Sequence, residues 1–353
     1  MKKKPSTNEM VERLLKGDRR SAARLITLVE NDMDDHHKVM SLVYPHTGKA
    51  MILGITGAGG VGKSTLSDHL IGRFRNQGKK VGVVVVDPSS PFSGGAFLGD
   101  RIRLQSHSQD DGVYIRSMAS RGYLGGLSRA TYDVIRIIEA MGNEVVIVET
   151  LGAGQDEVDV IHIANTCLLV VTPGMGDDIQ AMKAGIMEIA DIIVLNKADL
   201  DGADRSLRHL HQALTAGSFE EGEWIPRVVP TVSAANKPED LQGIDELAAA
   251  IAEHQTYLRR TRAIEQVRYN RVEQELGLIF KNELQKVVFK GLKGTGKKRE
   301  YINSIVEQRS DPYSVVKEVL NTYYTCYGST VHFPCELGRG PIPRRLSTIC
   351  TGL

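Results

Sequence analysis

One glycine-rich segment limits the fold of this chain more than any other feature. It reads Gly57-Ala58-Gly59-Gly60-Val61-Gly62-Lys63-Ser64-Thr65 and matches the spacing G-x-x-x-x-G-K-[ST] at every required position. The apolar run Met51–Thr56 precedes it, and Leu66–Leu70 follows it. Glycines let successive backbone N–H groups turn toward one anion, and a helix N-terminus adds partial positive charge. The pattern predicts a strand, a phosphate-binding loop and a helix.

Two side chains of this segment have expected roles in holding a nucleotide. Lys63 would reach the β- and γ-phosphates, and the Ser64 hydroxyl would ligate Mg²⁺. The alternative is a chance glycine-rich turn, which the correct flanking segments argue against. The segment by itself does not say which nucleotide binds.

A second motif bears on the base of that nucleotide. Asn196-Lys197-Ala198-Asp199 follows the apolar run Ile192–Leu195. The Asp199 carboxylate can accept two hydrogen bonds from guanine, whereas adenine would leave it unpaired at a cost of roughly 1–3 kcal/mol. Ser233-Ala234-Ala235 follows the next apolar run and fits a backbone loop that contacts the guanine oxygen. We therefore expect GTP, although Asp199 taken alone would also suit a simple cap.

Three acidic residues are candidates for a magnesium site. Asp87 and Glu149 each end an apolar run, and Asp100 lies in Gly99-Asp100-Arg101. Acids at the carboxyl ends of parallel strands share an edge with the phosphate loop, where Mg²⁺ or its waters would lie. A helix cap or a solvated loop is the alternative for each of them.

Short apolar runs alternating with longer amphipathic segments predict an α/β fold. The runs are Met51–Thr56, Val81–Val86, Glu144–Val148, Cys167–Thr172, Ile192–Leu195 and Val228–Val232. Their nearly continuous apolar character is typical of parallel strands covered by helices on both faces. Ligands of such sheets bind at the carboxyl edge of the strands.

Helical segments flank this region on both sides. Residues 6–47 have two apolar stripes at helical spacing, with Asp18 expected to cap the second helix. Beyond Gly243 the apolar spacing is helical and no further strand is expected. We predict a helical extension at 1–48, a nucleotide-binding domain at 49–262, a helical dimerisation region at 263–325 and a tail at 326–353. The alternative to self-association is packing of the last helices onto the domain.

Composition excludes several classes of protein. The net charge of +1 gives no reason to expect nucleic acid or a membrane surface as a partner. The four cysteines form no C-x-x-C pair, and neither a signal peptide nor an apolar span of about 18 residues is present. The chain reads as cytoplasmic. His36 and His37 stand among charged residues and are expected to be solvated.

Several blocks resemble the ArgK/MeaB family of GTPases, which are accessory proteins of methylmalonyl-CoA mutase. The blocks are Asp87–Pro91, Gly94–Arg103, Arg121–Leu127, Glu149–Gln155 and Asn196–Asp199. The resemblance covers about residues 10 to 320. It departs mildly at Leu151 and Ala153, where valines are more usual, and in the phosphate loop, which lacks a proline.

The resemblance implies a homodimeric P-loop GTPase of the signal-recognition/MinD-like class, with helical extensions at both ends. Such a protein is a chaperone that gates cobalamin loading of an adenosylcobalamin-dependent mutase and protects or reactivates it, with slow GTP hydrolysis as the switch. Lys63 and Ser64 would hold phosphate and Mg²⁺, and Asp87, Asp100 and Glu149 would form the metal and water shell. Gly94–Arg103 and Gly152–Glu157 resemble switch loops, and Gly174–Lys183 resembles a further mobile segment, with Lys183 a further candidate catalytic residue.

Three alternatives to this function remain open. The first is a kinase or ATPase linked to arginine (LAO/AO) transport. The second is a metal-insertion GTPase of the hydrogenase or urease accessory type, which would be expected to carry His-rich or Cys-containing segments. The third is a nucleotide-controlled scaffold with negligible turnover.

Overall fold

The computed structural model describes residues 5–87, 107, 109–119, 129–150, 160, 162–174, 190–217, 219, 222–234, 240–293 and 296–327. The chain divides into two compact units, Met1–Leu278 and Ile279–Leu353. The predicted division at residues 48, 262 and 325 stays a prediction.

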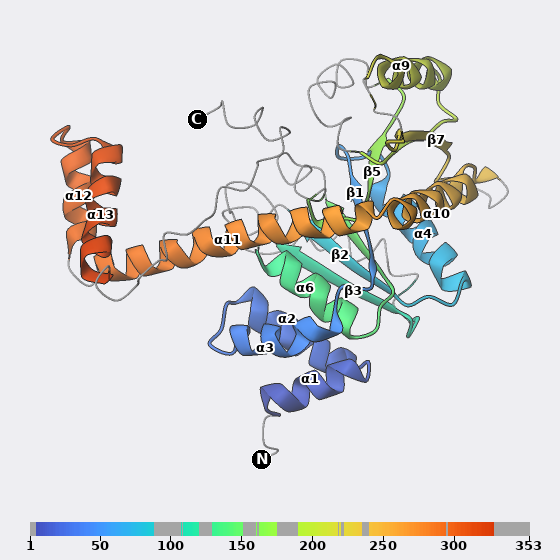
Figure 1. The fold of residues 1–353 in the computed structure, drawn as a ribbon. Coiled ribbons are helices and arrows are strands. Elements are labelled where there is room, and N and C mark those ends of the chain that lie inside the picture. Colours follow the sequence, from blue (N-terminus) through green and yellow to red (C-terminus); the bar gives the residue numbers. More distant parts are fainter. Residues whose placement is uncertain are drawn as a thin grey trace. The chain divides into compact units, whose positions relative to one another are not determined.

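The first unit is built on a parallel sheet of seven described strands (Figure 1). The strands are β1 (Met51–Thr56), β2 (Val81–Asp87), β3 (Val113–Ala119), β4 (Val145–Thr150), β5 (Thr166–Val171), β6 (Ile192–Asn196) and β7 (Arg227–Thr231). Their order is β3-β2-β4-β1-β5-β6-β7, and every neighbouring pair is parallel. The carboxyl ends of all strands therefore lie at one edge, and the predicted fold class is confirmed.

Helices cover both faces of this sheet. Helices α4 (Lys63–Asn76) and α10 (Ile244–Arg260) share a core with Leu53 and Ile55 of β1. Ile52 points to the other face, where α6 packs over β1, β2 and β4. The helices on that face include α1 (Thr7–Leu15), α2 (Arg19–Glu30), α3 (His36–Val43), the 3₁₀ turn η1 (Tyr44–His46) and α6 (Arg129–Ala140). Helix α9 (Ala203–Ala216) covers β5 and β6 with a smaller cluster of its own.

Local capping explains where the first helices begin. The Ser6 hydroxyl accepts from the Glu9 N–H, and the Ser6 N–H donates back to the Glu9 carboxylate, which forms a capping box. Asp18 accepts from the Ser21 N–H at 3.0 Å, so the predicted cap of α2 is confirmed.

The expectation of solvated histidines at 36 and 37 is wrong for His36. Its side chain is only 5% exposed and lies between two carboxylates, 2.8 Å from Asp133 of α6 and 3.0 Å from Asp32. His36 therefore joins α3 to α6, which helical spacing within α3 does not reveal. The neighbouring residue His37 is exposed.

The second unit is helical in its described part. Helix α11 (Ala263–Lys293) begins in the first unit and continues into the second, which also holds α12 (Lys297–Val306) and α13 (Pro312–Tyr327). The Tyr301 hydroxyl of α12 donates to Glu318 of α13 at 3.0 Å. None of the helices in the described ranges is both long and apolar enough to cross a membrane.

Candidate nucleotide-binding site

The phosphate loop leaves the carboxyl end of β1 in a conformation that only glycine adopts easily. Gly57 has φ +137°, and a Cβ there would lie 2.2 Å from the Val170 carbonyl oxygen of β5. Gly62 has φ +99°, and a Cβ there would lie 2.3 Å from Nδ2 of Asn196. These two glycines therefore keep the loop pressed against its neighbours, and the loop passes directly into α4 at Lys63.

Lys63 is held inside the loop that it belongs to. Its Nζ donates to the Gly57 carbonyl at 2.5 Å and to the Ala58 carbonyl at 2.9 Å. The residue is only 5% exposed. The ammonium group is therefore held beside the position that the anionic phosphates of a nucleotide would occupy.

A buried carboxylate stands beside the first turn of α4. Glu149, at the end of β4, is fully buried and accepts from the Ser64 hydroxyl at 2.5 Å and from the Ser67 hydroxyl at 2.8 Å. The register places Glu149 opposite Ile55 of β1 and Val85 of β2. The structure thus brings together two of the predicted magnesium ligands, Ser64 and Glu149.

Two hydroxyl groups near this edge are buried without a hydrogen-bond partner. They belong to Thr150 and Ser233, and they are the only such side-chain atoms in the described part of the chain. Unsatisfied buried hydroxyls cost about 1–3 kcal/mol each unless a ligand or ion supplies a partner. With the carboxylate of Glu149 and the hydroxyl of Ser64, oxygen ligands of the kind that Mg²⁺ prefers, this edge fits a magnesium nucleotide.

Asn196 connects the two predicted motifs. Its Nδ2 donates to the Val61 carbonyl of the phosphate loop at 2.8 Å. Its Oδ1 accepts from the Thr231 hydroxyl at 3.1 Å and from the Ser233 N–H at 3.3 Å. Asn196 thereby ties the phosphate loop to the segment that we expect to contact the base.

The rest of the Asn196–Asp199 motif turns toward the phosphate loop and solvent. Lys197 has φ +57°, and its Nζ donates to the Gly60 carbonyl at 2.9 Å. Asp199 is exposed, so its carboxylate is accessible to a base. The arrangement agrees with the stem of Lys197 lying beside the base and with Asp199 reading it, and both roles stay predictions.

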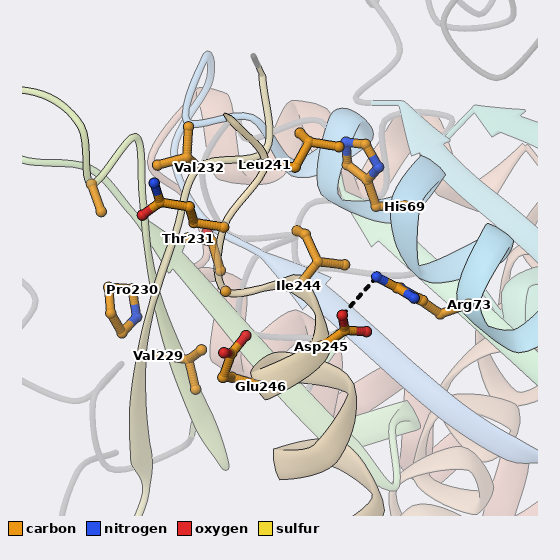
Figure 2. A pocket seen from close by; sticks show the side chains of 13 residues that line it. His69, Arg73, Val229, Pro230, Thr231, Val232, Leu241, Ile244, Asp245 and Glu246 are labelled. Atoms are coloured by element: carbon orange, nitrogen blue, oxygen red, sulfur yellow. Dashed lines mark hydrogen bonds and ion pairs between the residues drawn. The ribbon is translucent and has the colours of Figure 1, made fainter. Parts of the chain in front are cut away.

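A cavity of about 590 Å³ opens next to this motif, between β7 and the start of α10 (Figure 2). Ala198 and Thr231 contribute to its wall, and Arg73 of α4 pairs with Asp245 of α10 across it at 2.8 Å. His69 lies at its rim, where Nε2 is 2.8 Å from the Ser233 carbonyl oxygen. Helix α4 therefore contacts the Ser233 segment as well as carrying Lys63.

Several predicted site residues lie outside the described residues. They are Asp100, Lys183 and Ala235, together with the whole of Gly94–Arg103 and Gly152–Glu157 and all of Gly174–Lys183 except Gly174. Asp87 is the last residue of β2, which pairs with β4, but the structure does not describe its side chain. Ala234 is described and follows Ser233 directly.

Sequence reasoning missed two residues of this site. Ser67 holds the second oxygen of Glu149, and His69 contacts the Ser233 backbone. Ser67 could have been found, since it lies one helical turn after Ser64 and so shares its face. The contact of His69 depends on how α4 and β7 pack, which no local pattern reveals.

A parallel sheet with a phosphate loop after its central strand defines a P-loop nucleotide-binding protein. Within that class, the family model described as "Methylmalonyl Co-A mutase-associated GTPase MeaB" matches residues 22–293. The chain therefore belongs to the MeaB family of GTPases.

Individual relatives agree with this placement. A candidate GTPase of Pyrococcus abyssi is 49% identical over 315 residues, which cover 89% of this chain and 95% of the relative. The GTPase ArgK of Escherichia coli is 36% identical, with 78% of this chain and 86% of the relative covered. The mitochondrial methylmalonic aciduria type A homolog of Caenorhabditis elegans is 27% identical, with 91% and 84% covered.

A solved structure gives the same result for the fold. The crystal structure of a LAO/AO transport system kinase aligns with a TM-score of 0.66 at 26% identity, covering 92% of this chain and 99% of that one. The chain thus shares its fold over nearly its whole length with that protein.

Proposed function

We propose that this chain is a GTP-hydrolysing accessory protein of an adenosylcobalamin-dependent methylmalonyl-CoA mutase or a related acyl-CoA mutase. It would gate cobalamin loading and protect or reactivate the mutase. The observation that carries the proposal is the match of residues 22–293 to a family described as mutase-associated. The name of the relative from Caenorhabditis elegans, which refers to methylmalonic aciduria, supports it.

GTP would bind along the carboxyl edge of the sheet. The backbone from Gly57 to Thr65 would surround the phosphates, with Lys63 neutralising their charge. The base would lie against Lys197 and the Ser233-Ala234-Ala235 segment, with Asp199 accepting two hydrogen bonds from guanine. The exposed position of Asp199 and the contact of Lys197 with Gly60 support this arrangement.

Mg²⁺ would be held by Ser64, Glu149, Asp87 and Asp100, directly or through water. When bound, the ion neutralises charge on the phosphates. Glu149 would orient a water or a metal ligand, because its carboxylate is fully buried and fixed by two serine hydroxyls. Lys183 would be a further catalytic cation.

Asn196 gives the site a way to signal its state. It bonds to the phosphate loop through Val61 and to the base segment through Ser233. A shift of the loop on loss of the γ-phosphate would therefore reach the base segment through one side chain. Low intrinsic turnover suits such a switch, and hydrolysis at about 10 s⁻¹ without a partner would argue against it.

We further propose that the chain forms a homodimer through its C-terminal helices. Apolar side chains of α11 at helical spacing are exposed, namely Tyr269 (65%), Leu276 (49%), Phe280 (66%) and Leu284 (61%). We refer to these four residues as the α11 stripe. A second copy of the chain is a suitable partner, since an exposed apolar stripe of this length is unfavourable in water.

The proposal is tested by co-purification. The tagged protein, loaded with a non-hydrolysable GTP analogue, is mixed with apo-mutase and cobalamin, and both capture and cobalamin loading are measured. We expect capture and loading to depend on the nucleotide and to be lost in Lys63→Ala, because that variant lacks the phosphate-binding cation. Equal capture by Lys63→Ala and by the wild type would contradict the GTP-dependent role.

A second candidate is a kinase linked to transport, which the name of the aligned LAO/AO transport system kinase suggests. The two candidates differ in the acceptor of the γ-phosphate. With γ-labelled GTP, an accessory GTPase releases labelled inorganic phosphate, whereas a kinase transfers label to a protein or small-molecule acceptor. Label retained on an acceptor would favour the kinase.

A further inference from the structure

A second cavity lies at the opposite edge of the sheet from the phosphate loop. It has a volume of about 170 Å³, and all of its lining residues belong to the first unit. Its walls come from the start of β1, from α6, from the turn after η1 and from α11. Ile52 lines it, and it precedes Gly57 by five positions along β1, so the two sites are roughly 16 Å apart.

Two of the charged groups in this cavity are paired. Arg136 of α6 makes a bidentate ion pair with Glu275 of α11 and lies over the ring of Tyr44, 4.9 Å from its centroid. Glu139 accepts from the backbone N–H groups of Lys49 and Ala50. These contacts fix α11 and the start of β1.

Two arginines of α11 lack a carboxylate partner in the described part of the chain. Arg271 is half-buried, and its Nη1 donates only to the Ile163 carbonyl, at a long 3.4 Å. Arg268 donates from Nη2 to the Gly48 carbonyl at 2.7 Å. Burial, followed by the neighbouring Arg136, lowers the pKa of Arg271, although a guanidinium stays charged at neutral pH.

The wall of the cavity itself is therefore positively charged. Three guanidinium groups and one carboxylate, Glu139, line it, and Glu139 already accepts from two backbone N–H groups. Two further carboxylates, Glu275 and Asp133, are ion-pair partners of Arg136. The charges of Glu139 and Glu275 favour the charged form of Arg271, but burial, Arg136 and Arg268 oppose it and the net effect is a lowered pKa, so its desolvation is only partly offset. The cavity has both the space and the charge to accept an anion.

We propose that this cavity binds a small oxyanion, a phosphate group or a carboxylate, between Arg268 and Arg271. The planar fork of a guanidinium matches two oxygens of either group, and such charge-assisted bonds are stronger than neutral ones. A volume of about 170 Å³ equals that of about five or six waters, which suits a small oxyanion and excludes a whole nucleotide.

Binding of an oxyanion at this position would strengthen the contacts that residues 268–275 of α11 make within the first unit. Arg268, Arg271 and Glu275 already join this helix to Gly48, Ile163 and Arg136 respectively. An anion between Arg268 and Arg271 would add a shared partner to two of these three contacts. The site would then act on the helix that carries the α11 stripe.

The test uses the full-length protein saturated with GDP and Mg²⁺, so that the phosphate loop is occupied. Inorganic phosphate and acetate are titrated separately by calorimetry, in chloride buffer of constant ionic strength. We expect saturable binding of at least one of them, at one site per chain. Binding of phosphate alone identifies a phosphate site, and binding of acetate alone identifies a carboxylate site.

Variants locate the binding. Arg271→Gln should raise the dissociation constant at least tenfold, equivalent to about 1.4 kcal/mol. Arg268→Gln should raise it as well, and since Arg268 is exposed this variant tests the site even if Arg271→Gln does not fold. Arg260→Gln makes the same charge change at an exposed end of α10 and should leave binding unchanged. GDP affinity serves as the check that each variant is folded.

Two results would overturn the proposal. One is the absence of saturable binding of both anions to the wild-type protein. The other is binding to Arg268→Gln and to folded Arg271→Gln with the wild-type dissociation constant, which would place any anion elsewhere.

Discussion

The Ser64 hydroxyl donates a hydrogen bond of 2.5 Å to the Glu149 carboxylate, joining the first turn of α4 to the carboxyl end of β4. Glu149 is fully buried, and a buried carboxylate is costly unless donors surround it. Ser64 and Ser67 supply two of these donors from one face of α4. The pair thus places a negative charge beside the phosphate loop, where a metal ion or an attacking water would lie.

Glu149→Gln should separate binding from hydrolysis. The amide has the shape of the carboxylate and keeps one acceptor for a serine, so we expect GTP affinity within a few-fold of the wild type. The lost charge should lower the hydrolysis rate by about 100-fold or more, the usual effect of removing an acid–base or metal-orienting group. Single-turnover hydrolysis and fluorescent-nucleotide binding measure the two effects.

Ser67→Ala is the matched control for Glu149→Gln. It removes one hydrogen bond to Glu149 but leaves the charge and the Ser64 contact, so its hydrolysis should fall less. A rate in Glu149→Gln equal to that of the wild type would remove Glu149 from the catalytic set.

Gly62→Ala should weaken both the fold and the nucleotide site. The added Cβ would lie 2.3 Å from Nδ2 of Asn196, at a residue with φ +99°. Asn196 would have to move away from the Val61 carbonyl. We expect a loss of about 1–3 kcal/mol in the free energy of unfolding and weaker GTP binding, measured by urea denaturation and by titration.

Gly72→Ala provides the contrasting substitution. Gly72 lies within α4, and a Cβ there meets nothing within 4 Å. Alanine should therefore stabilise the helix by roughly 0.5–1 kcal/mol. If both alanine variants changed stability equally, the packing of Gly62 against Asn196 would not be the cause.

The sequence predicts all five central strands of the described sheet and one of its two edge strands. Continuous apolar residues mark the central strands, which are covered on both sides, and the run Val228–Val232 also finds the partly exposed edge strand β7. The edge strand β3 was missed. It pairs only with β2 and includes Arg116, whose guanidinium pairs with Glu30 of α2.

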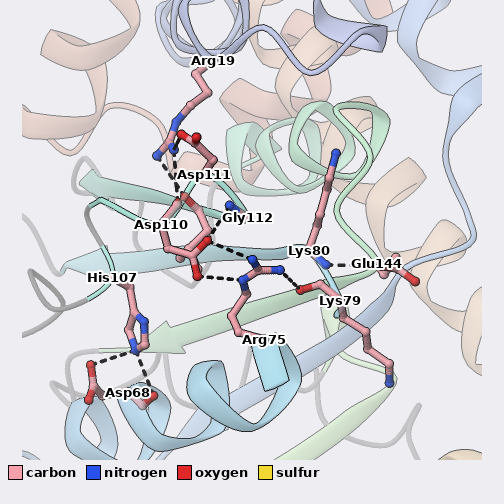
Figure 3. Close-up of polar contacts among 11 residues, drawn as sticks. Arg19, Asp68, Arg75, Lys79, Lys80, His107, Asp110, Asp111, Gly112 and Glu144 are labelled. Atoms are coloured by element: carbon pink, nitrogen blue, oxygen red, sulfur yellow. Dashed lines mark hydrogen bonds and ion pairs between the residues drawn. The ribbon is translucent and has the colours of Figure 1, made fainter. Parts of the chain in front are cut away.

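The turn before β3 shows why a local pattern could not find that strand. Arg75 of α4 donates to both carboxylate oxygens of Asp110, at 2.8 and 2.9 Å, and the Gly112 N–H donates to the same carboxylate (Figure 3). A Cβ at Gly112 would lie 2.1 Å from Cζ of Arg75. The start of β3 is thus set by a side chain 35 residues earlier in the chain.

The candidate site likewise has some features that a local sequence pattern predicts and others that depend on packing between distant segments. The phosphate loop and the Asn196–Asp199 motif carry their chemistry in local spacing, so sequence identifies them. The bond from Asn196 to Val61 and the contact of His69 with Ser233 depend on the packing of distant segments. They required the structure.

Asp199→Asn should relax the preference for guanine. The amide replaces one acceptor with a donor, so it loses a bond to guanine, at a cost of roughly 1–3 kcal/mol or about 10–100-fold in affinity. Xanthosine triphosphate, which has a carbonyl in place of the guanine amine, should bind more tightly than it does to the wild type. Competition titrations with GTP, ATP and xanthosine triphosphate measure this change.

Asp201→Asn makes the same charge change two residues away, at an exposed position. It should leave nucleotide selectivity unchanged. Strong selectivity for GTP retained by Asp199→Asn would reject the role of Asp199 in reading the base.

Asp191 and His254 form a titratable pair near the amino end of β6, away from the phosphate loop. The Asp191 carboxylate lies 3.3 Å from Nε2 of His254 and accepts from the Cys167 N–H at 2.7 Å. Burial raises the pKa of Asp191 to about 7 and lowers the pKa of His254 to about 4. The ring of Trp224, the single tryptophan of the chain, lies 4.7 Å from that of His254.

The two groups affect stability in opposite directions. The raised pKa of Asp191 gives stability that is complete below the ordinary value of 3.8 and is lost as pH rises through about 7. The lowered pKa of His254 gives stability that is present above 6.5 and is lost as pH falls through about 4. Between these limits the two contributions partly cancel, so a difference between variants is needed to separate them.

Asp191→Asn isolates the carboxylate. Between about pH 6 and about pH 8, the wild type should lose up to about 1 kcal/mol relative to Asp191→Asn in the free energy of unfolding. This is an upper bound, because the Asp191 side chain is 31% exposed and solvent screens its charge. Urea denaturation followed by Trp224 fluorescence measures the difference. The difference in the free energy of unfolding between the wild type and the exposed control Asp201→Asn should not change over this pH range. If the difference between the wild type and Asp191→Asn did not change with pH either, the raised pKa of Asp191 would be disproved.

Phe280→Glu tests the proposed dimer. Phe280 is 66% exposed and lies near the middle of the α11 stripe. Successive members of the stripe are seven, four and four residues apart in sequence, so all four lie on the same face of the helix. Burying a phenylalanine against a second copy contributes about 1.5–3 kcal/mol, and a dimer would bury two of them. A glutamate there would instead bury a charge, so the dissociation constant should rise by at least about tenfold.

Gln285→Glu adds the same charge at an exposed position of α11 on the side away from the stripe, and it should stay dimeric. Light scattering during size-exclusion chromatography gives the mass of each protein, and a monomeric wild type, or a Phe280→Glu variant as dimeric as Gln285→Glu, would exclude this face as the interface.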